Sequence, residues 1–457
     1  MADDPGAWLS RAIAARTAQR MDEALDAIAR AAALAPDAPQ IALGLAQLRF
    51  EAGLPAAALF ERAAALLPQR PDVLRSHALA LAAEGEPAAA DAMLDALLGA
   101  NPLWLDGHRA LASLRTTAGQ SDFARSYERA VAAQPGVPAL RMAWFHVLCT
   151  ARRWNDARAV LDATEQALGE QRACRMARAY LLSESGEAAD DPALFDALEH
   201  EQDTGLDLAR VRHFLRGGQI ARARDIALRH RGQPTMGAFW PYLSLAWRLL
   251  DDPQARWLDG DMDFVRAFDT DLTAPELDQL AQTLRTLHTA QAPWHEQSVR
   301  GGTQTERPLL LRLDPVIQRA RAAIERALRD YIGALPDADP AHPLLSRPRG
   351  AFLFAGSWSV RLRPHGFHAA HTHPMGWLSS ALYVTVPQGE SLGPPPAGRL
   401  QFGTPPPELA LPLAPYGDIE PKPGRLALFP STMWHGTAPF TDGERMTIAF
   451  DVVPAPL

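Results

Sequence analysis

The strongest constraint on the fold is a repeat of 32–34 residues that occupies residues 1 to about 165. Alanine- and leucine-rich segments such as ALDAIARAAAL and AALFERAAALL place apolar residues at helical spacing. Prolines that end successive helices recur at spacings of 32, 34 and 33 residues, at Pro36, Pro68, Pro102 and Pro135. A fixed spacing of this size predicts a solenoid, in which each helix pair buries its apolar face against its neighbours.

Glycines between the two helices of each pair recur with the same period. Gly53, Gly85 and Gly119 are separated by 32 and 34 residues. Two helices per unit and a terminating proline are typical of tetratricopeptide repeats. Most aromatic positions of that consensus are absent, so we call the region tetratricopeptide-like. An irregular helical bundle is the alternative, because alanine-rich helices easily imitate a repeat.

The pattern of apolar and turn-forming residues changes twice after the repeats. Helical segments such as LDLARVRHFLRGG continue to about residue 290 without a clear period, and a further amphipathic helix is predicted from Pro315. From about residue 351, short alternating runs are separated by Pro, Gly and Asp clusters, which predicts antiparallel strands. We therefore expect an α + β multidomain chain with tetratricopeptide-like repeats over 1–165, a further helical region or linker over 166–290, and a double-stranded β-helix (jelly-roll) domain with covering helices over 291–457.

Composition excludes several classes of protein. No apolar run approaches the roughly 20 residues of a transmembrane helix, so we expect no membrane partner. A net charge of −8 argues against binding to nucleic acid. The start, MADDPGAWLS, lacks a basic, apolar leader, and the only cysteines, Cys149 and Cys174, lie far apart; both features indicate a cytoplasmic protein. Lys422 is the only lysine, which disfavours lysine-based covalent catalysis.

Two separated segments of the predicted β domain carry groups suited to chemistry. His371 and His373 precede the strand WLSSALYVTV, and side chains at i and i+2 of an extended chain point to the same face. Further on, His435 follows a strand, and Arg445 and Thr447 share one face of the returning strand RMTIAF. If that face is the interior, a guanidinium is buried and needs an anionic partner. That partner could be a ligand carboxylate.

The runs RGGTQT, GSWSVRL, HTHPMGWLSSALYV, LFPSTMWHGTAPF and ERMTIAFDVVP resemble a bacterial family of 2-oxoglutarate- and Fe(II)-dependent oxygenases fused to tetratricopeptide repeats. The resemblance implies that His371 and His435 are iron ligands and that Arg445 and Thr447 hold the distal carboxylate of 2-oxoglutarate. Tyr383 is a further candidate for that carboxylate. The resemblance also implies Fe(II), 2-oxoglutarate and dioxygen as the reacting partners.

The sequence departs from the wider superfamily at the second ligand, where His373 stands in place of Asp or Glu. In one interpretation His373 is the third ligand, and the metal keeps its full +2 charge because imidazoles are neutral. In a second interpretation His373 is not a ligand and the coordination position is open to another anion. In a third interpretation the histidine cluster is structural.

Fusion to the repeats indicates the class of substrate. Tetratricopeptide arrays bind extended or helical peptides, so we expect a dioxygenase that hydroxylates a peptide or protein side chain presented by the repeats. The alternatives are a non-catalytic peptide-binding scaffold with a degenerate barrel and a small-molecule 2-oxoglutarate oxygenase. The RGGTQT stretch is expected to be a loop or turn. Side chains that could face the substrate, or only pack, are Trp358, Arg361, Trp377, Ser380, Arg300 and Gln304.

Overall fold

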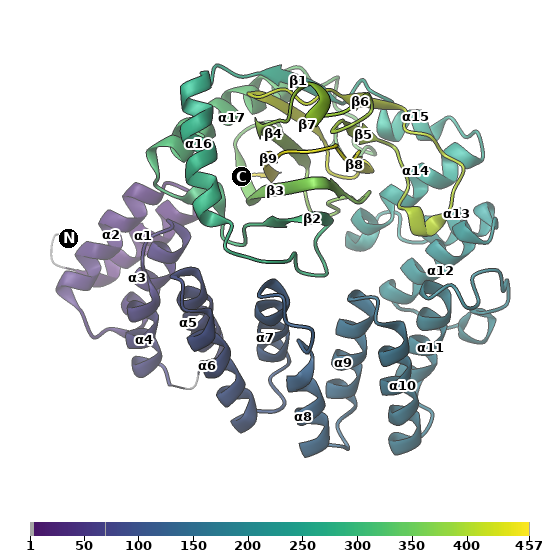
Figure 1. The fold of residues 1–457 in the computed structure, drawn as a ribbon, viewed down its shortest axis with the longest axis horizontal. Coiled ribbons are helices and arrows are strands. Elements are labelled where there is room, and N and C mark those ends of the chain that lie inside the picture. Colours follow the sequence, from purple (N-terminus) through teal and green to yellow (C-terminus); the bar gives the residue numbers. More distant parts are fainter. Residues whose placement is uncertain (1–3, 69, 457) are drawn as a thin grey trace. The chain divides into compact units, whose positions relative to one another are not determined.

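The computed structural model describes residues 4–68 and 70–456, and these divide into two compact units (Figure 1). Of the described residues, the first unit comprises 4–68, 70–147, 290–295 and 305–321, and the second comprises 148–289, 296–304 and 322–456. The boundary falls within helices α9 (Pro138–Thr150) and α17 (Pro315–Gly333). Each unit is described separately below.

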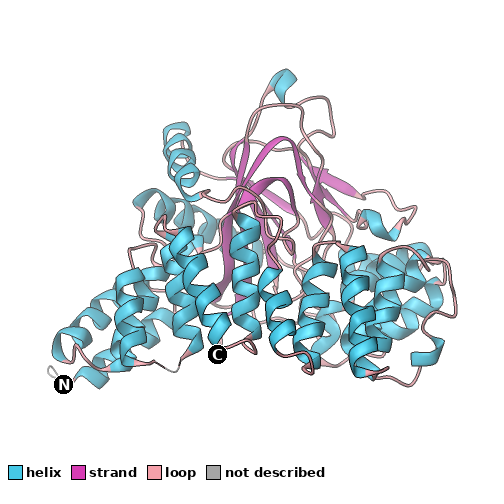
Figure 2. Cartoon of the chain, turned by 60° about the horizontal axis from the view of Figure 1, so that its bottom comes forward, coloured by secondary structure: helices cyan, strands magenta, loops and turns pink. Residues whose placement is uncertain are grey.

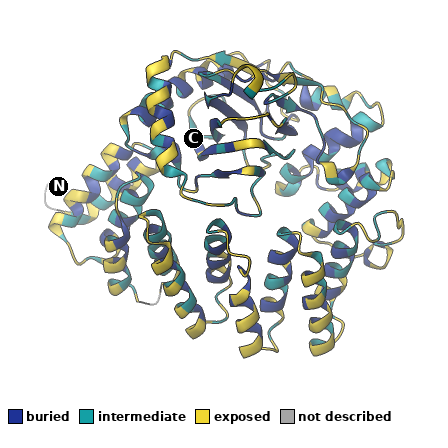
Figure 3. Cartoon of the chain, in the orientation of Figure 1, coloured by how far each residue is buried: buried dark blue, intermediate teal, exposed yellow. Residues whose placement is uncertain are grey.

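The first unit is a series of antiparallel helix pairs with alanine-rich contacts. Proline at the first helical position begins α1, α3, α5 and α6, where its missing N–H costs no hydrogen bond. Figure 3 shows a buried and an exposed stripe on these helices, as the periodicity predicts. The helices are α1 (Pro5–Thr17), α2 (Met21–Leu34), α3 (Pro39–Glu51), α4 (Ala57–Leu66), α5 (Pro71–Ala83), α6 (Pro87–Ala100), α7 (Leu105–Thr117), α8 (Arg125–Ala133) and α9. The predicted N-terminal helical solenoid is confirmed.

The turn inside each helix pair contains a residue in the left-handed region, and this feature recurs further than the sequence period suggests. Successive positions are separated by 34, 32, 34, 33, 34 and 32 residues. They are Gln19, Gly53, Gly85, Gly119, Arg152, Gly186 and Gly218. Two of the seven are not glycine, which hides the period from a search for glycines. The repeated turn thus extends well beyond residue 165.

The second unit contains further helices, several of which pack on one apolar cluster. The cluster includes Phe214, Leu243 and Trp247 from the helices together with Leu409 and Trp434 from the β region. The helical elements are α10 (Trp154–Leu168), α11 (Arg172–Glu184), η1 (Asp196–Leu198), α12 (Thr204–Arg216), α13 (Ile220–Leu228), η2 (Pro234–Ala238), α14 (Trp240–Leu249), α15 (Gln254–Asp259), α16 (Ala274–Leu287) and the end of α17. Among residues 4–68 and 70–456, no helix combines the length and the hydropathy needed to cross a bilayer.

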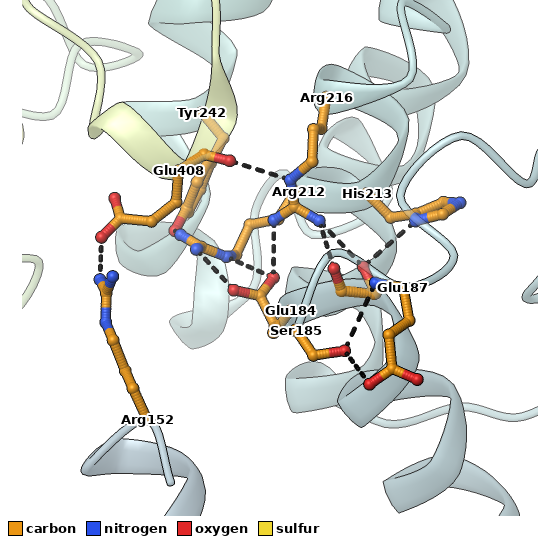
Figure 4. Close-up of polar contacts among 10 residues, drawn as sticks. Arg152, Glu184, Ser185, Glu187, Arg212, His213, Arg216, Tyr242 and Glu408 are labelled. Atoms are coloured by element: carbon orange, nitrogen blue, oxygen red, sulfur yellow. Dashed lines mark hydrogen bonds and ion pairs between the residues drawn. The ribbon is translucent and has the colours of Figure 1, made fainter. Parts of the chain in front are cut away.

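A buried ionic cluster centred on Glu184 joins α11 to α12 (Figure 4). Arg212 donates two hydrogen bonds to the Glu184 carboxylate (3.0 and 2.8 Å), and Arg216 donates a third (3.2 Å). Arg216 also donates to the backbone oxygen of Glu408 (2.9 Å), whose side chain forms an ion pair with Arg152. Burial alone would raise the pKa of Glu184, but the two arginines lower it below its usual value. The carboxylate is therefore ionised and joins α11 to α12, and Arg216 links this pair of helices to Glu408 of the β region.

We expect the substitution Glu184→Gln to destabilise the protein by about 3–5 kcal/mol, because it leaves two largely buried guanidinium groups without their counter-charge. Urea unfolding of the full chain measures this. The control is Glu187→Gln, which breaks a more exposed ion pair with Arg158 and should cost about 0–1 kcal/mol. Equal losses in the two variants would contradict the role assigned to Glu184.

The β region of the second unit consists of two antiparallel sheets (Figure 2). The larger has six strands in the order β1-β7-β4-β9-β3-β2, and the smaller has the order β6-β5-β8. The strands are β1 (Arg266–Asp269), β2 (Val299–Gln304), β3 (Phe352–His368), β4 (Leu378–Thr385), β5 (Leu400–Phe402), β6 (Gly417–Ile419), β7 (Arg425–Pro430), β8 (His435–Thr437) and β9 (Arg445–Pro454), with short turns η4 (Gly389–Ser391) and η5 (Pro407–Leu409). This arrangement confirms the predicted C-terminal jelly-roll domain.

The RGGTQT stretch is mostly strand β2, not the loop or turn that we expected. It pairs with β3, and the register shifts between Arg300 and Gly302. A side chain at Gly302 would place its Cβ 2.4 Å from the backbone oxygen of Arg361, so the close approach of the strands requires glycine. The two glycines indicated a turn in the sequence, whereas the structure uses them at a bulge.

Helices α16 and α17 cover the larger sheet. Helix α17 begins at Pro315, as predicted, and its apolar residues Ile324, Leu328 and Tyr331 are buried. The Tyr331 hydroxyl donates a hydrogen bond to the backbone oxygen of Phe264 (2.6 Å). Helix α16 packs on β4, and all of that strand except its last residue is buried. The covering helices therefore exclude water from the face of the sheet on which they pack.

Candidate metal centre and anion site

Three histidines from two distant segments meet at one point of the β domain. Each of His371, His373 and His435 offers a ring nitrogen, and these atoms lie within 4.8 Å of one another. The backbones of His371 and His435 exchange two hydrogen bonds (2.9 and 3.1 Å), and the His373 amide donates to the backbone oxygen of Ser431 (2.9 Å). His435 lies on β8, and Trp434 before it donates to the backbone oxygen of Pro241 on α14 (2.8 Å). The cluster is thus held by backbone contacts on both segments.

Hydrogen bonds set the tautomer of all three rings in the same way. Nδ1–H of His371 and of His435 donates to the backbone oxygen two residues earlier (2.8 and 3.0 Å). Nδ1–H of His373 donates to Oδ2 of Asp451 (2.7 Å). A neutral imidazole that donates from Nδ1 carries its lone pair on Nε2, so each ring has one nitrogen ready to ligate a metal.

Burial keeps the imidazoles of His371 and His435 neutral. The pKa of His371 is lowered well below its ordinary value by burial and then by repulsion from His435 and His373. Burial and repulsion from His373 likewise lower the pKa of His435. A metal ligand must be deprotonated at the binding nitrogen, so no proton has to be displaced from His371 or His435 at neutral pH. Three imidazole nitrogen donors with this spacing fit a first-row metal ion such as Fe(II).

A buried cation lies on β9, on the face it shares with Tyr383 of β4. Arg445 is 1% exposed, and its Cζ lies 5.0 Å from the centre of the Tyr383 ring. Thr447 is also buried and is the cross-strand partner of Tyr383. Burial lowers the pKa of Arg445 and raises that of Tyr383, because each charged form is disfavoured away from water.

Three polar atoms of Arg445 and Tyr383 lack a hydrogen-bond partner within the described part of the chain. Among the described residues, no hydrogen-bond partner is found for Nε and Nη1 of Arg445 or for the Tyr383 hydroxyl. An unpaired buried guanidinium is costly, and a carboxylate that accepts its N–H groups would remove that cost. The structure therefore has donors fitted to an anionic ligand in the same domain as the histidine cluster.

Comparison with protein families identifies this domain. Residues 356–451, which include the three histidines, Tyr383, Arg445 and Thr447, match the family model described as "Putative 2OG-Fe(II) oxygenase". The chain carries a 2OG-Fe(II) oxygenase domain. Its metal is Fe(II), and its cosubstrate is 2-oxoglutarate. The chain is therefore an enzyme, a 2-oxoglutarate- and Fe(II)-dependent dioxygenase.

Solved structures give distant likenesses to different parts of the chain. The 2-oxoglutarate complex of a viral collagen prolyl hydroxylase from Paramecium Bursaria Chlorella virus-1 is 16% identical, with 42% of this chain and 97% of that chain covered and a TM-score of 0.29. A Pseudomonas putida prolyl-4-hydroxylase is 17% identical over 43% and 97%, with a TM-score of 0.31. A tetratricopeptide repeat protein from Parabacteroides merdae is 14% identical over 53% and 98%, with a TM-score of 0.33. No curated protein matches the chain.

Two of the predicted substrate residues lie on the site face of the oxygenase domain or at its edge. Trp358 of β3 stacks on the His373 ring, with centroids 5.7 Å apart and planes at 12°. Arg300 of β2 lies two residues after Ser298, and it donates to the backbone oxygens of Gln297 and Val299 (both 2.8 Å).

The structure does not bring the other four substrate candidates to the histidines. Arg361 forms an ion pair with Glu444 (2.5 Å), which is bonded to α16 through Arg285. Trp377 is buried and donates to the backbone oxygen of Leu344 (3.0 Å). Ser380 is buried and bonds the backbone of Phe450 (2.9 Å). Gln304 pairs with Val360 at the end of β2.

Three polar residues that the sequence reading did not select lie beside the cluster. Ser298 Oγ lies 3.2 Å from Nε2 of His371 and 3.0 Å from Nδ1 of His368. Asp451 accepts from His373, and Ser379 donates to the other oxygen of that carboxylate (2.5 Å). Asp451 continues the alternation of Arg445 and Thr447 along β9, and that period was the signal that could have found it.

Proposed function

We propose that His371, His373 and His435 hold Fe(II), and that Arg445 binds the distal carboxylate of 2-oxoglutarate with help from Thr447 and Tyr383. The observation that carries this proposal is the convergence of three Nε2 lone pairs in the same domain as a buried guanidinium, two of whose nitrogens lack a hydrogen-bond partner among the described residues. The first interpretation of His373, as a third ligand, is favoured because its ring has the same tautomer as the other two.

When bound, iron and 2-oxoglutarate supply the oxidising chemistry: 2-oxoglutarate and dioxygen are consumed, succinate and carbon dioxide are released, and one oxygen atom enters a C–H bond of the substrate. The chain supplies orientation and exclusion of water. Arg445 fixes one end of the cosubstrate by charge-assisted hydrogen bonds. Trp358, stacked on His373, covers one side of that ring and limits its rotation.

We further propose that the substrate is a side chain of a peptide or protein bound by the repeats of residues 1–165 and oxidised by the domain of residues 291–457, with residues 166–290 as a helical connection. Helical repeat arrays recognise peptides along their length. Covalent fusion raises the effective concentration of a bound peptide at the catalytic domain, which gives the fusion a function.

Two assays on the full chain test this proposal. Succinate formation from 2-oxoglutarate with Fe(II) tests the oxygenase reaction, and peptides captured by the chain are examined by mass spectrometry for a gain of one oxygen atom. Oxygenated peptide is expected from the wild type and not from His435→Ala. Captured peptide without oxygenation, under conditions where succinate forms, would instead support a small-molecule substrate. Capture without any succinate would contradict the oxygenase reaction of this domain.

A further inference from the structure

The proposed ligand set contains no carboxylate, but the carboxylate of Asp451 is hydrogen-bonded to one of the three histidines. Asp451 Oδ2 accepts the Nδ1–H of His373 at 2.7 Å, although the two residues are 78 positions apart in the chain. Both side chains are largely shielded, with 18% of His373 and 13% of Asp451 exposed. A bond this short between an imidazole and a shielded carboxylate is stronger than a neutral hydrogen bond.

Strand β9 places Asp451 on the face that also carries the anion site. Arg445, Thr447, Ala449 and Asp451 alternate along this strand, so their side chains share one face. Asp451 is the cross-strand partner of Ser379 on β4. One strand thus carries the cation at its first residue and the carboxylate six residues further on, on the same face.

The Asp451 carboxylate is held by its neighbours and has little freedom to rotate. Ser379 donates to Oδ1 at 2.5 Å, and Ser379 also bonds Ser431 (2.9 Å), whose backbone accepts from the His373 amide. A Cβ at Gly376 would lie 2.5 Å from Ser431 Oγ and 3.4 Å from Asp451 Cβ, so the chain around the carboxylate is closely packed. The contact between Asp451 and His373 is therefore fixed by the packing of the residues around it.

We propose that Asp451 is a positioning residue of the metal centre: it fixes the orientation and tautomer of His373 and supplies, through that ring, the negative charge that a ligand carboxylate would supply directly. A carboxylate that accepts Nδ1–H orients the ring and makes its Nε2 more basic, which strengthens metal binding. With Asp451 behind it, the three-histidine set offers the metal a similar charge to two histidines and one carboxylate. This inference rests on the proposed role of His373 as a ligand.

The substitution Asp451→Asn tests the charge while keeping the shape and a hydrogen-bond acceptor. We expect the Kd for Fe(II), measured by anaerobic titration of the full chain without 2-oxoglutarate, to rise about 10- to 100-fold. The control is Ser379→Ala, which removes the other contact of the carboxylate but keeps its charge and should raise the Kd less. Thermal unfolding without metal shows whether each variant folds.

The same substitution made in the variant His373→Asp separates electrostatic positioning by Asp451 from a purely structural role. In His373→Asp the charge is already present at the ligand position, and Asp451 then repels it. We expect Asp451→Asn to leave the Kd of that variant unchanged or to lower it. A merely structural Asp451 would give the same loss in both backgrounds, and that result would overturn the inference. An unchanged Kd for Asp451→Asn in the wild-type background would overturn it while leaving the proposed function intact, whereas no binding of Fe(II) to the wild type would overturn both.

Discussion

Replacement of His435 by alanine is expected to abolish retention of Fe(II). His435 is buried, and its ring lies against both other histidines, with centroids 4.2 Å from His371 and 5.2 Å from His373. Loss of one of three nitrogen donors should weaken binding by more than the roughly 10- to 100-fold that substitutions behind a ligand cost. Metal analysis after anaerobic loading and gel filtration measures the iron that remains.

The control for His435→Ala is His365→Asn, a change at an exposed histidine near the end of β3. His365 has a positive φ of 62°, which asparagine tolerates better than most residues. This variant should retain iron as the wild type does. Full retention of iron by His435→Ala would show that the cluster is not the metal site.

Replacement of Arg445 by alanine is expected to weaken the binding of 2-oxoglutarate while leaving Fe(II) bound. The guanidinium is buried with two nitrogens unpartnered among the described residues, so a cosubstrate carboxylate would be its main polar contact. Removal of one partner of such a pair costs about 2–5 kcal/mol, or roughly 30- to 4,000-fold in Kd. Calorimetric titration of the iron-loaded protein with 2-oxoglutarate under anaerobic conditions measures the loss.

Arg285→Ala is the matched control for Arg445→Ala. Arg285 of α16 forms an ion pair with Glu444 (2.6 Å), the residue next to Arg445, and 40% of its side chain is exposed. Its removal changes the charge near the start of β9 without reaching the buried face, so the affinity for 2-oxoglutarate should stay the same. Equal affinity of Arg445→Ala and the wild type would contradict the cosubstrate role of Arg445.

Local periods explain how much of the fold could be predicted. The helices and the antiparallel strands are visible in the sequence because apolar residues recur about every 3.6 residues in a helix and every 2 residues in a strand. The continued repeat was missed because one of its turns places Arg152, not glycine, in the left-handed region. Strand β2 was missed because Gly301 and Gly302 serve a close strand approach that only the partner strand reveals.

The residues of the candidate site likewise include some that the local sequence pattern predicts and some that it does not. His371, His373, Arg445 and Thr447 could be selected because each pair shares a face through the i, i+2 rule. The contact between His373 and Asp451 could not be predicted, because the two residues are 78 positions apart in the sequence and meet only through the register of the sheet. The apparent lack of a carboxylate was therefore a property of the local motif and not of the folded site.

The central claim is that one iron is held by three imidazoles. X-ray absorption spectroscopy of the anaerobic Fe(II)-loaded protein, which counts the imidazole ligands, tests it most directly. We predict three histidines per iron in the wild type and two in His373→Ala. Two histidines per iron in both proteins would contradict the account, because His373 would then stand beside the metal without binding it.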